Sequence, residues 1–209
     1  MMGMIKKDLL MIKNNYKMLI ITFILFIFYS FMFEVDMSFF LPFMGLMVCI
    51  STINYDEYNN WHTYAISLPQ GRINVVKSKY LTTIGLTLVL AIISFSISFL
   101  LMNSRDAIKI DESFSAILGE LLAIIFMMSV LFPVLFKFGY EKGRMTMILI
   151  GVGMFGIVYL FQNVFQLEIS TSFLSFLETY LPVIFIVLSV VMLIISYFIS
   201  KKIYLKREF

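Results

Sequence analysis

The feature that most constrains this chain is a series of six long stretches without a charged side chain, at 18–33, 37–55, 80–103, 121–136, 145–167 and 179–200. A helix needs about 20 mostly apolar residues to cross the roughly 30 Å of hydrocarbon in a bilayer. The fourth stretch is short, so we expect its span to cover about 116–136. With 61% hydrophobic and only 14% charged residues, a soluble fold could not bury so much apolar surface. The sequence therefore predicts an all-α polytopic membrane protein, a single transmembrane domain over 1–209 with six transmembrane helices.

The basic residues predict how these spans are oriented. Lysine and arginine mark the cytoplasmic side of membrane proteins. Of the 16 basic residues, all but Arg105 and Lys109 fall in the segments on one side of six consecutive spans. We therefore expect the N- and C-termini, and the segment between the second and third spans, to be cytoplasmic.

The residues before the first span have the pattern of an amphipathic helix. Over residues 4–16, apolar side chains recur at helical spacing, and lysines occupy other sides of the helix. The apolar positions are Ile5, Leu9, Ile12 and Tyr16. This pattern is typical of a helix that lies in the inner membrane interface. The alternative interpretation is a frayed basic leader.

The cytoplasmic segment 56–79 is the most informative part of the chain. It is too polar to cross the membrane and too long for a plain turn between two spans. Asp56 can cap the start of a helix, and Glu57 suits its first turn. Pro69 with Gly71 would close that unit, and we expect a second short helix to lead into the third span.

Aromatic and apolar residues form one face of this predicted cytoplasmic helix. Trp61, Tyr64, Ala65 and Leu68 recur at spacings of three and four, and Tyr58 extends the face by one turn. Such a stripe could dock a partner protein. It could equally be an aromatic belt that anchors the helix at the headgroups. The pattern alone does not decide between docking and anchoring.

Motifs for catalysis or cofactor binding are not supported by the sequence. Gly151, Gly153 and Gly156 match G-x-G-x-x-G, but they lie inside an apolar run and not between a strand and a helix. We interpret them as sites of close helix approach or of a local bend. There is no Walker A loop, and His62 and Cys49 are the only histidine and cysteine. We therefore predict no catalytic residue and no metal site in this chain.

Two residues of the fourth run carry open interpretations. Glu120 could contact a substrate within the membrane, or it could lie at the level of the headgroups, which we favour. Pro133 is expected to kink the helix or to end it early.

The segment between the second and third spans also carries a resemblance to a known family. The leader, the six spans and this segment resemble the small ABC-2-type permeases of low-GC Gram-positive bacteria, and most of all the membrane subunits of staphylococcal phenol-soluble modulin exporters. The signature residues are Tyr55, Asp56, Glu57, Trp61, Tyr64, Ser67, Leu68, Pro69, Arg72, Val75, Val76, Lys79 and Tyr80.

The resemblance implies a transporter subunit of the bacterial cytoplasmic membrane that is not itself an enzyme. The segment 56–79 would be a coupling segment that docks on two cytoplasmic ABC ATPase subunits, which would bind ATP and Mg²⁺. A second permease copy or a paralogue would complete the transporter, and no nucleic acid is expected. The docking residues would be Tyr55, Asp56, Glu57, Tyr58, Trp61, His62, Tyr64, Ala65, Leu68 and Pro69.

The cargo implied by the resemblance is an amphipathic, membrane-active peptide such as a phenol-soluble modulin. An aromatic- and methionine-rich bundle is compatible with such a cargo, because flexible, polarizable side chains adapt to varied apolar surfaces. Alternatives are a permease for a bacteriocin, an antibiotic or a lipid-like cargo, and an anchor subunit that transports nothing. No residue of the substrate path can be assigned from the sequence.

Overall fold

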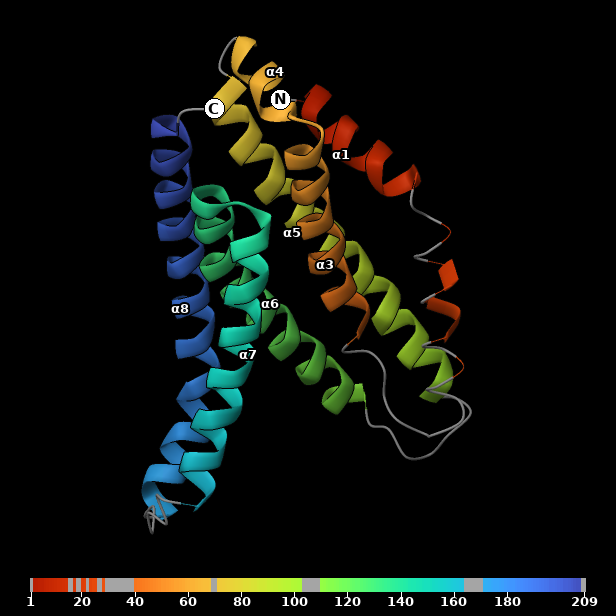
Figure 1. The fold of residues 1–209 in the computed structure, drawn as a ribbon. Coiled ribbons are helices and arrows are strands. Elements are labelled where there is room, and N and C mark those ends of the chain that lie inside the picture. Colours follow the sequence, from red (N-terminus) through yellow and green to blue (C-terminus); the bar gives the residue numbers. More distant parts are fainter. Residues whose placement is uncertain are drawn as a thin grey trace.

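The computed structural model describes residues 2–14, 17, 20–21, 23–25, 28, 40–68, 71–102, 110–163 and 171–207. Its helices are α1 (Met2–Asn14), α3 (Phe40–Tyr58), α4 (Trp61–Ser67), α5 (Gly71–Met102), α6 (Ile110–Phe138), α7 (Tyr140–Asn163) and α8 (Thr171–Lys206) (Figure 1). The described residues contain no strand, which confirms the prediction of an all-α chain.

Three of the described helices are long and apolar enough to cross a membrane. They are Gly71–Ile97 in α5, Ser115–Phe138 in α6 and Val183–Lys206 in α8. The predicted first span, 18–33, lies mostly outside the described residues, as do parts of the loops on the predicted outer side. The full set of six spans therefore stays a prediction.

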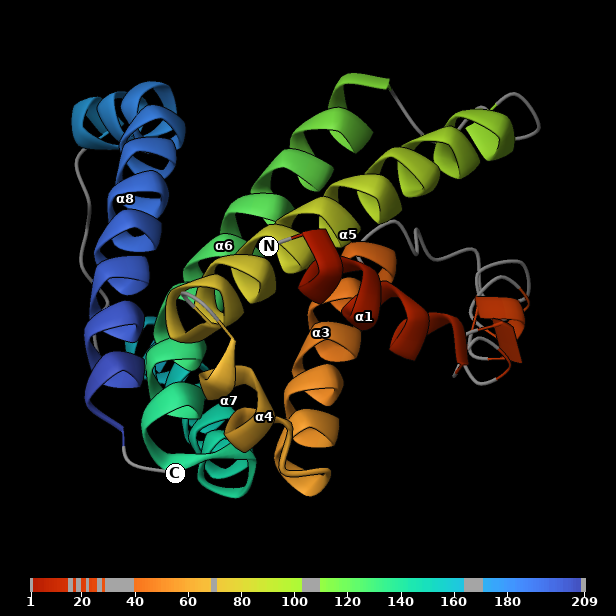
Figure 2. The same ribbon diagram turned by 90° about the horizontal axis from the view of Figure 1, so that it is seen from above.

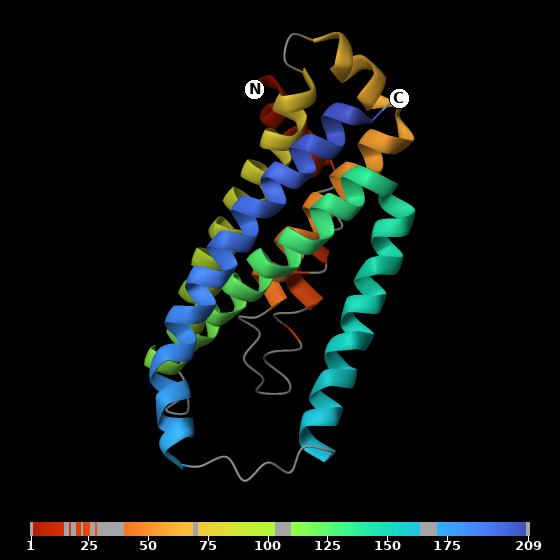
Figure 3. The same cartoon turned by 90° about the vertical axis from the view of Figure 1, so that its left-hand side faces the viewer.

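The long helices form a bundle whose two chain ends lie together. α6 packs along α8, and α3 packs along α5, while α5 also contacts α6 and α8. Figures 1 and 2 show α1 lying across α3 and α5 at one end of the bundle. The short helix α4 and both termini are at this same end (Figures 1 and 3).

The best-packed part of the core lies between α3, α5, α6 and α8. Its buried side chains include Leu46, Ile50, Val76, Tyr80, Met128, Leu131, Phe132, Phe136 and Tyr204. The Tyr80 hydroxyl is within hydrogen-bond distance of the hydroxyls of Ser196, at 2.6 Å, and Ser200, at 2.9 Å. In an apolar surrounding such bonds fix one helix on the next, here α5 on α8.

Away from this core, the long helices expose apolar side chains. On α8, for example, Val187 and Phe198 are 57% and 61% exposed. A soluble protein rarely shows apolar surface continuously along a helix, whereas a bilayer provides an apolar solvent for it. The arrangement fits a chain whose helices are surrounded by lipid.

One expectation about a helix end was wrong, and one of the two alternatives for Pro133, an early end of the helix, is excluded. The second short helix does not exist as a separate element, because α5 runs without a break from Gly71 into the predicted third span. Helix α6 does not end at Pro133 but continues to Phe138.

The chain reverses direction at Gly139, whose φ of 85° lies in the left-handed region that glycine adopts at little cost. The Gly139 N–H donates to the Leu135 carbonyl oxygen at 2.9 Å and so closes the end of α6.

Candidate functional site

The predicted coupling segment, 56–79, is folded as the end of α3, a turn, the short helix α4 and the start of α5. The sequence suggested that Asp56 caps the start of a helix. The structure shows otherwise, because helix α3 continues past Asp56 to Tyr58. The turn is made at Asn59 and Asn60, and Asn60 has a φ of 50°, which asparagine tolerates better than most residues. Helix α4 therefore begins at Trp61, with Asn60 at its N-cap position in place of Asp56, four residues later than expected.

The ten predicted docking residues separate into an exposed and a buried group. Tyr58, Tyr64 and Tyr55 are 84%, 57% and 40% exposed. Glu57, Trp61 and Leu68 are half-buried, and Pro69 lies outside the described residues. Asp56, His62 and Ala65 are buried. The structure thus brings only part of the set together on one accessible surface, around Tyr58 and Tyr64.

The buried side of α4 is fixed by packing and by one hydrogen bond. Ala65 is fully buried, and Trp61 and Leu68 pack against the core. His62 Nδ1 lies 2.7 Å from the hydroxyl of Tyr204 on α8. Burial lowers the pKa of His62 below its usual value, so the neutral imidazole is favoured. This side of the predicted stripe therefore anchors α4 to the chain's own bundle.

Asp56 belongs to a buried ion cluster that connects three helices. Lys79 Nζ on α5 lies 2.7 Å from Asp56 Oδ2 on α3 and 2.8 Å from Asp8 Oδ1 on α1. Lys7 on α1 pairs with Asp56 as well, and its Nζ lies 3.2 Å from Asp8 Oδ1. The hydroxyl of Thr52 accepts a further hydrogen bond from Lys79 at 2.9 Å. The two carboxylates and the two ammonium groups give the cluster no net charge, and this pairing is what makes burial of charged groups tolerable.

Glu57, the neighbour of Asp56, contacts a different helix, α7. Its Oε2 accepts a hydrogen bond of 2.7 Å from the backbone N–H of Tyr140, the first residue of α7. A carboxylate at this position satisfies a free amide and is stabilised by the partial positive charge of the helix N-terminus. Oε1 lies 3.7 Å from Arg207, which also donates to the Phe136 carbonyl oxygen at 3.0 Å. Glu57 thus joins the coupling segment to α7 and to the C-terminal end of the chain.

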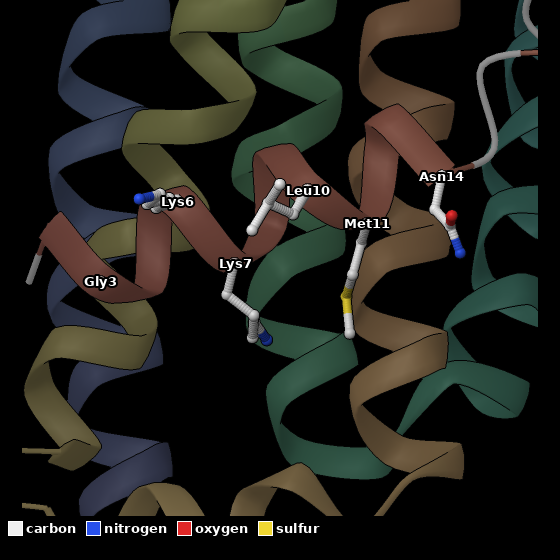
Figure 4. Close-up of a pocket in the computed structure, with 6 residues that line it drawn as sticks. All are labelled: Gly3, Lys6, Lys7, Leu10, Met11 and Asn14. Atoms are coloured by element: carbon white, nitrogen blue, oxygen red, sulfur yellow. The ribbon is translucent and has the colours of Figure 1, made fainter.

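Helix α1 carries an open groove along its length (Figure 4). A space of about 540 Å³ is lined by Gly3, Lys6, Lys7, Leu10, Met11 and Asn14. Lys7 and Met11 project from the same side of the helix in this view. The Lys7 ammonium also lies 4.6 Å from the ring centroid of Trp61, so α1 contacts α4 directly.

Lys7, Asp8, Lys79, Tyr204 and Arg207 were not recognised as site residues from the sequence. Their partners are far away in the chain, and helical periodicity reports only neighbours three or four residues apart. One signal was available. Asp8 is the only acid before residue 34, in a segment otherwise rich in lysine.

The remaining candidates are placed away from the coupling segment. Glu120 is 4% exposed and lies beside the backbone of Phe43, in the first turn of α3. Gly151, Gly153 and Gly156 lie within α7, and a Cβ added at any of them would meet no atom within 4 Å. The structure contains no group of three or more potential metal ligands among the residues that it describes.

Comparison with known proteins identifies the family. The family model described as "ABC-2 family transporter protein" matches residues 3–205, nearly the whole chain. No curated protein and no solved structure matches the chain. Members of this family are membrane subunits of transporters, and the apolar helices described above suit that role. The chain belongs to the ABC-2 transporter family.

Proposed function

We propose that this chain is the permease subunit of an ATP-binding-cassette exporter. Six helices cross the membrane, both termini are cytoplasmic, and two separate ATPase subunits bind ATP and Mg²⁺. A second permease, either another copy or a paralogue, completes the transport path. The coupling segment 56–79 docks on the ATPases and conveys their movement to the spans.

The observation that carries this proposal is the position of α4. It stands beside both chain ends at the end of the bundle (Figure 1). The exposed residues here are Tyr58 at the end of α3, Asn59 and Asn60 in the turn, and Thr63, Tyr64 and Ser67 in α4, all of them uncharged. An uncharged surface with two exposed tyrosines fits a protein groove, because the core of a protein interface is enriched in aromatic residues and depleted of charged ones. We call these six residues the docking surface.

Charge substitution on the docking surface tests the proposal without disturbing the core. Tyr58→Asp and Tyr64→Asp place a carboxylate where the ATPase would exclude water, and each should weaken co-purification with the ATPase at least tenfold. The ATPase should be the product of the reading frame beside this gene, co-expressed with the permease. Phe138→Asp is the matched control, because Phe138 is an aromatic residue, 48% exposed, at the same end of the bundle. Unchanged binding of both tyrosine variants would refute docking through this surface.

The proposed cargo is an amphipathic, membrane-active peptide such as a phenol-soluble modulin. The support is the family resemblance, together with a bundle that contains 16 methionines and 23 phenylalanines. We expect such a peptide to stimulate ATP hydrolysis by the complex in lipid vesicles several-fold. A bacteriocin or a lipid-like antibiotic tested in parallel should have little effect. The opposite order would assign the permease to one of these other cargoes.

A further inference from the structure

The ion cluster of Lys7, Asp8, Asp56 and Lys79 is more than a stabilising feature of the core. Asp8 and Asp56 are 1% and 0% exposed, and Lys79 is 2% exposed. Taking four charges out of water is costly, and replacing such a cluster by apolar residues is often neutral or favourable for stability. A buried ion cluster therefore serves best to fix one particular arrangement of the elements that supply its charges. Here those elements are α1, α3 and α5.

The cluster attaches α1 to both sides of the turn in the coupling segment. Lys7 pairs with Asp56, in the last turn of α3, and lies over the ring of Trp61, the first residue of α4. Lys7 therefore contacts a residue on each side of the turn at Asn59 and Asn60. A displacement of α4 relative to the bundle would displace Lys7 as well. Lys79, at the base of α5, holds the neighbouring Asp8 in the same network.

The rest of α1 contacts the bundle through a few apolar side chains and exposes several others. Met4 and Asp8 are its only buried side chains. Met2, Leu9 and Leu10 are more than half exposed, and Lys6 and Lys13 are exposed as well. An amphipathic helix with this pattern can rest on the membrane surface with its apolar side chains among the headgroups. Its charged contacts with protein are concentrated around Lys7 and Asp8, whereas Met4 belongs to the core cluster and Ile12 lines an apolar space together with Leu41 of α3 and Leu86 of α5.

We propose that α1 moves as one body with the coupling segment and carries the movement of the ATPases to the inner membrane surface. Lys7, Asp8, Asp56 and Lys79 are positioning residues for this movement. This inference rests on the proposed function, since the ATPases supply the movement. The movement of the ATPases would then reach two parts of the permease, the transmembrane helices and the N-terminal helix α1.

The first test examines the attachment in the permease alone, in lipid nanodiscs. The double variant Lys7→Met with Asp8→Asn removes the two charges that α1 contributes to the cluster and leaves the Asp56–Lys79 pair neutral and intact, so the bundle should fold. We expect backbone amides of α1 to exchange hydrogen for deuterium at least tenfold faster, with α5 and α6 unchanged. Lys6→Met, on the exposed side of the same helix, is the control and should have no effect. Unchanged exchange in the double variant would overturn the proposal.

The second test examines movement in the complex with the ATPase subunits. Spin labels are placed at exposed lysines in a Cys49→Ala background, one pair at Lys13 and Lys77 and another at Lys13 and Lys202. A non-hydrolysable ATP analogue should leave the 13–77 distance unchanged and change the 13–202 distance. In the Lys7→Met, Asp8→Asn variant the 13–77 distance should change too. Equal changes of both distances in the unsubstituted permease would overturn the proposal, whereas failure of the ATPase to bind at all would refute the proposed function instead.

Discussion

At the scale of single residues, two adjacent carboxylates of the coupling segment act on different parts of the bundle. Asp56 faces inward to Lys7 and Lys79, whereas Glu57 turns toward α7 and Arg207. Successive residues of a helix point about 100° apart, so a pair at the end of α3 can reach two neighbours at once. Through these two side chains, the end of α3 is connected to α1, α5 and α7.

The neighbouring His62 should make the stability of the permease depend on pH. Burial lowers the pKa of His62 in the folded chain, while the unfolded chain retains a value of about 6.5. Between these two values the unfolded chain binds a proton that the folded chain does not bind, so stability falls as the pH falls below about 6.5. It levels off below the pKa of the folded state. Thermal unfolding followed by circular dichroism should show this loss, and His62→Gln, which cannot titrate, should reduce it. An identical pH profile in the two proteins would contradict the assignment.

The charged residues show what sequence patterns can and cannot predict. Counting Lys79 and Lys7 among the basic residues of one side was enough to predict an orientation of the chain. Pairing them with Asp8 and Asp56 was not possible, because these contacts join α1, α3 and α5 across 49 and 71 residues. The same limit applied to the docking residues. Helical spacing placed Ala65 and Tyr64 on one face, but the packing of α4 buries Ala65 and leaves Tyr64 exposed.

At the scale of the elements, absence of charge predicted where long helices occur but not where they end. The predicted spans 80–103 and 116–136 fall almost entirely inside α5 and α6. The end of α3 was placed too early because the charge of Asp56 suggested a boundary. Its burial in the ion cluster lets the helix continue to Tyr58. Likewise α5 continues past the charged Lys79, since Lys79 is neutralised inside the bundle.

The tight passage from α4 to α5 depends on Gly71. A Cβ added there would lie 1.7 Å from the carbonyl oxygen of Ala65, a backbone atom that cannot swing aside. We therefore expect Gly71→Ala to lower the free energy of unfolding by about 1–3 kcal/mol and to displace α4. Gly85→Ala is the matched control, because a Cβ at Gly85 in the same helix meets no atom within 4 Å. That variant should be stabilised by about 0.5–1 kcal/mol. Denaturant unfolding in detergent measures both, and equal effects would contradict the packing of α4 on α5.

At the scale of the whole molecule, the distribution of charge and the position of the chain ends support each other. The net charge of +3 conceals a strong asymmetry, since only Arg105 and Lys109 are basic on the predicted outer side. The structure brings the N-terminus, the C-terminus and α4 to one end of the bundle. The predicted even number of membrane crossings would account for this placement, and the positive charges predict that this end faces the cytoplasm.

Thiol labelling in cells tests this orientation directly. Cys49 is the single cysteine and is buried, so Cys49→Ala gives a background without reactive thiols. Asn60→Cys, in the turn before α4, should react with a membrane-impermeant maleimide only after the cells are permeabilised. Lys206→Cys, near the C-terminus, should behave in the same way. Ile110→Cys, at the start of α6, should react in intact cells, because α6 crosses the membrane toward Gly139. Labelling of positions 60 and 110 from the same side would refute the six-span arrangement, and with it the access of the ATPase to α4.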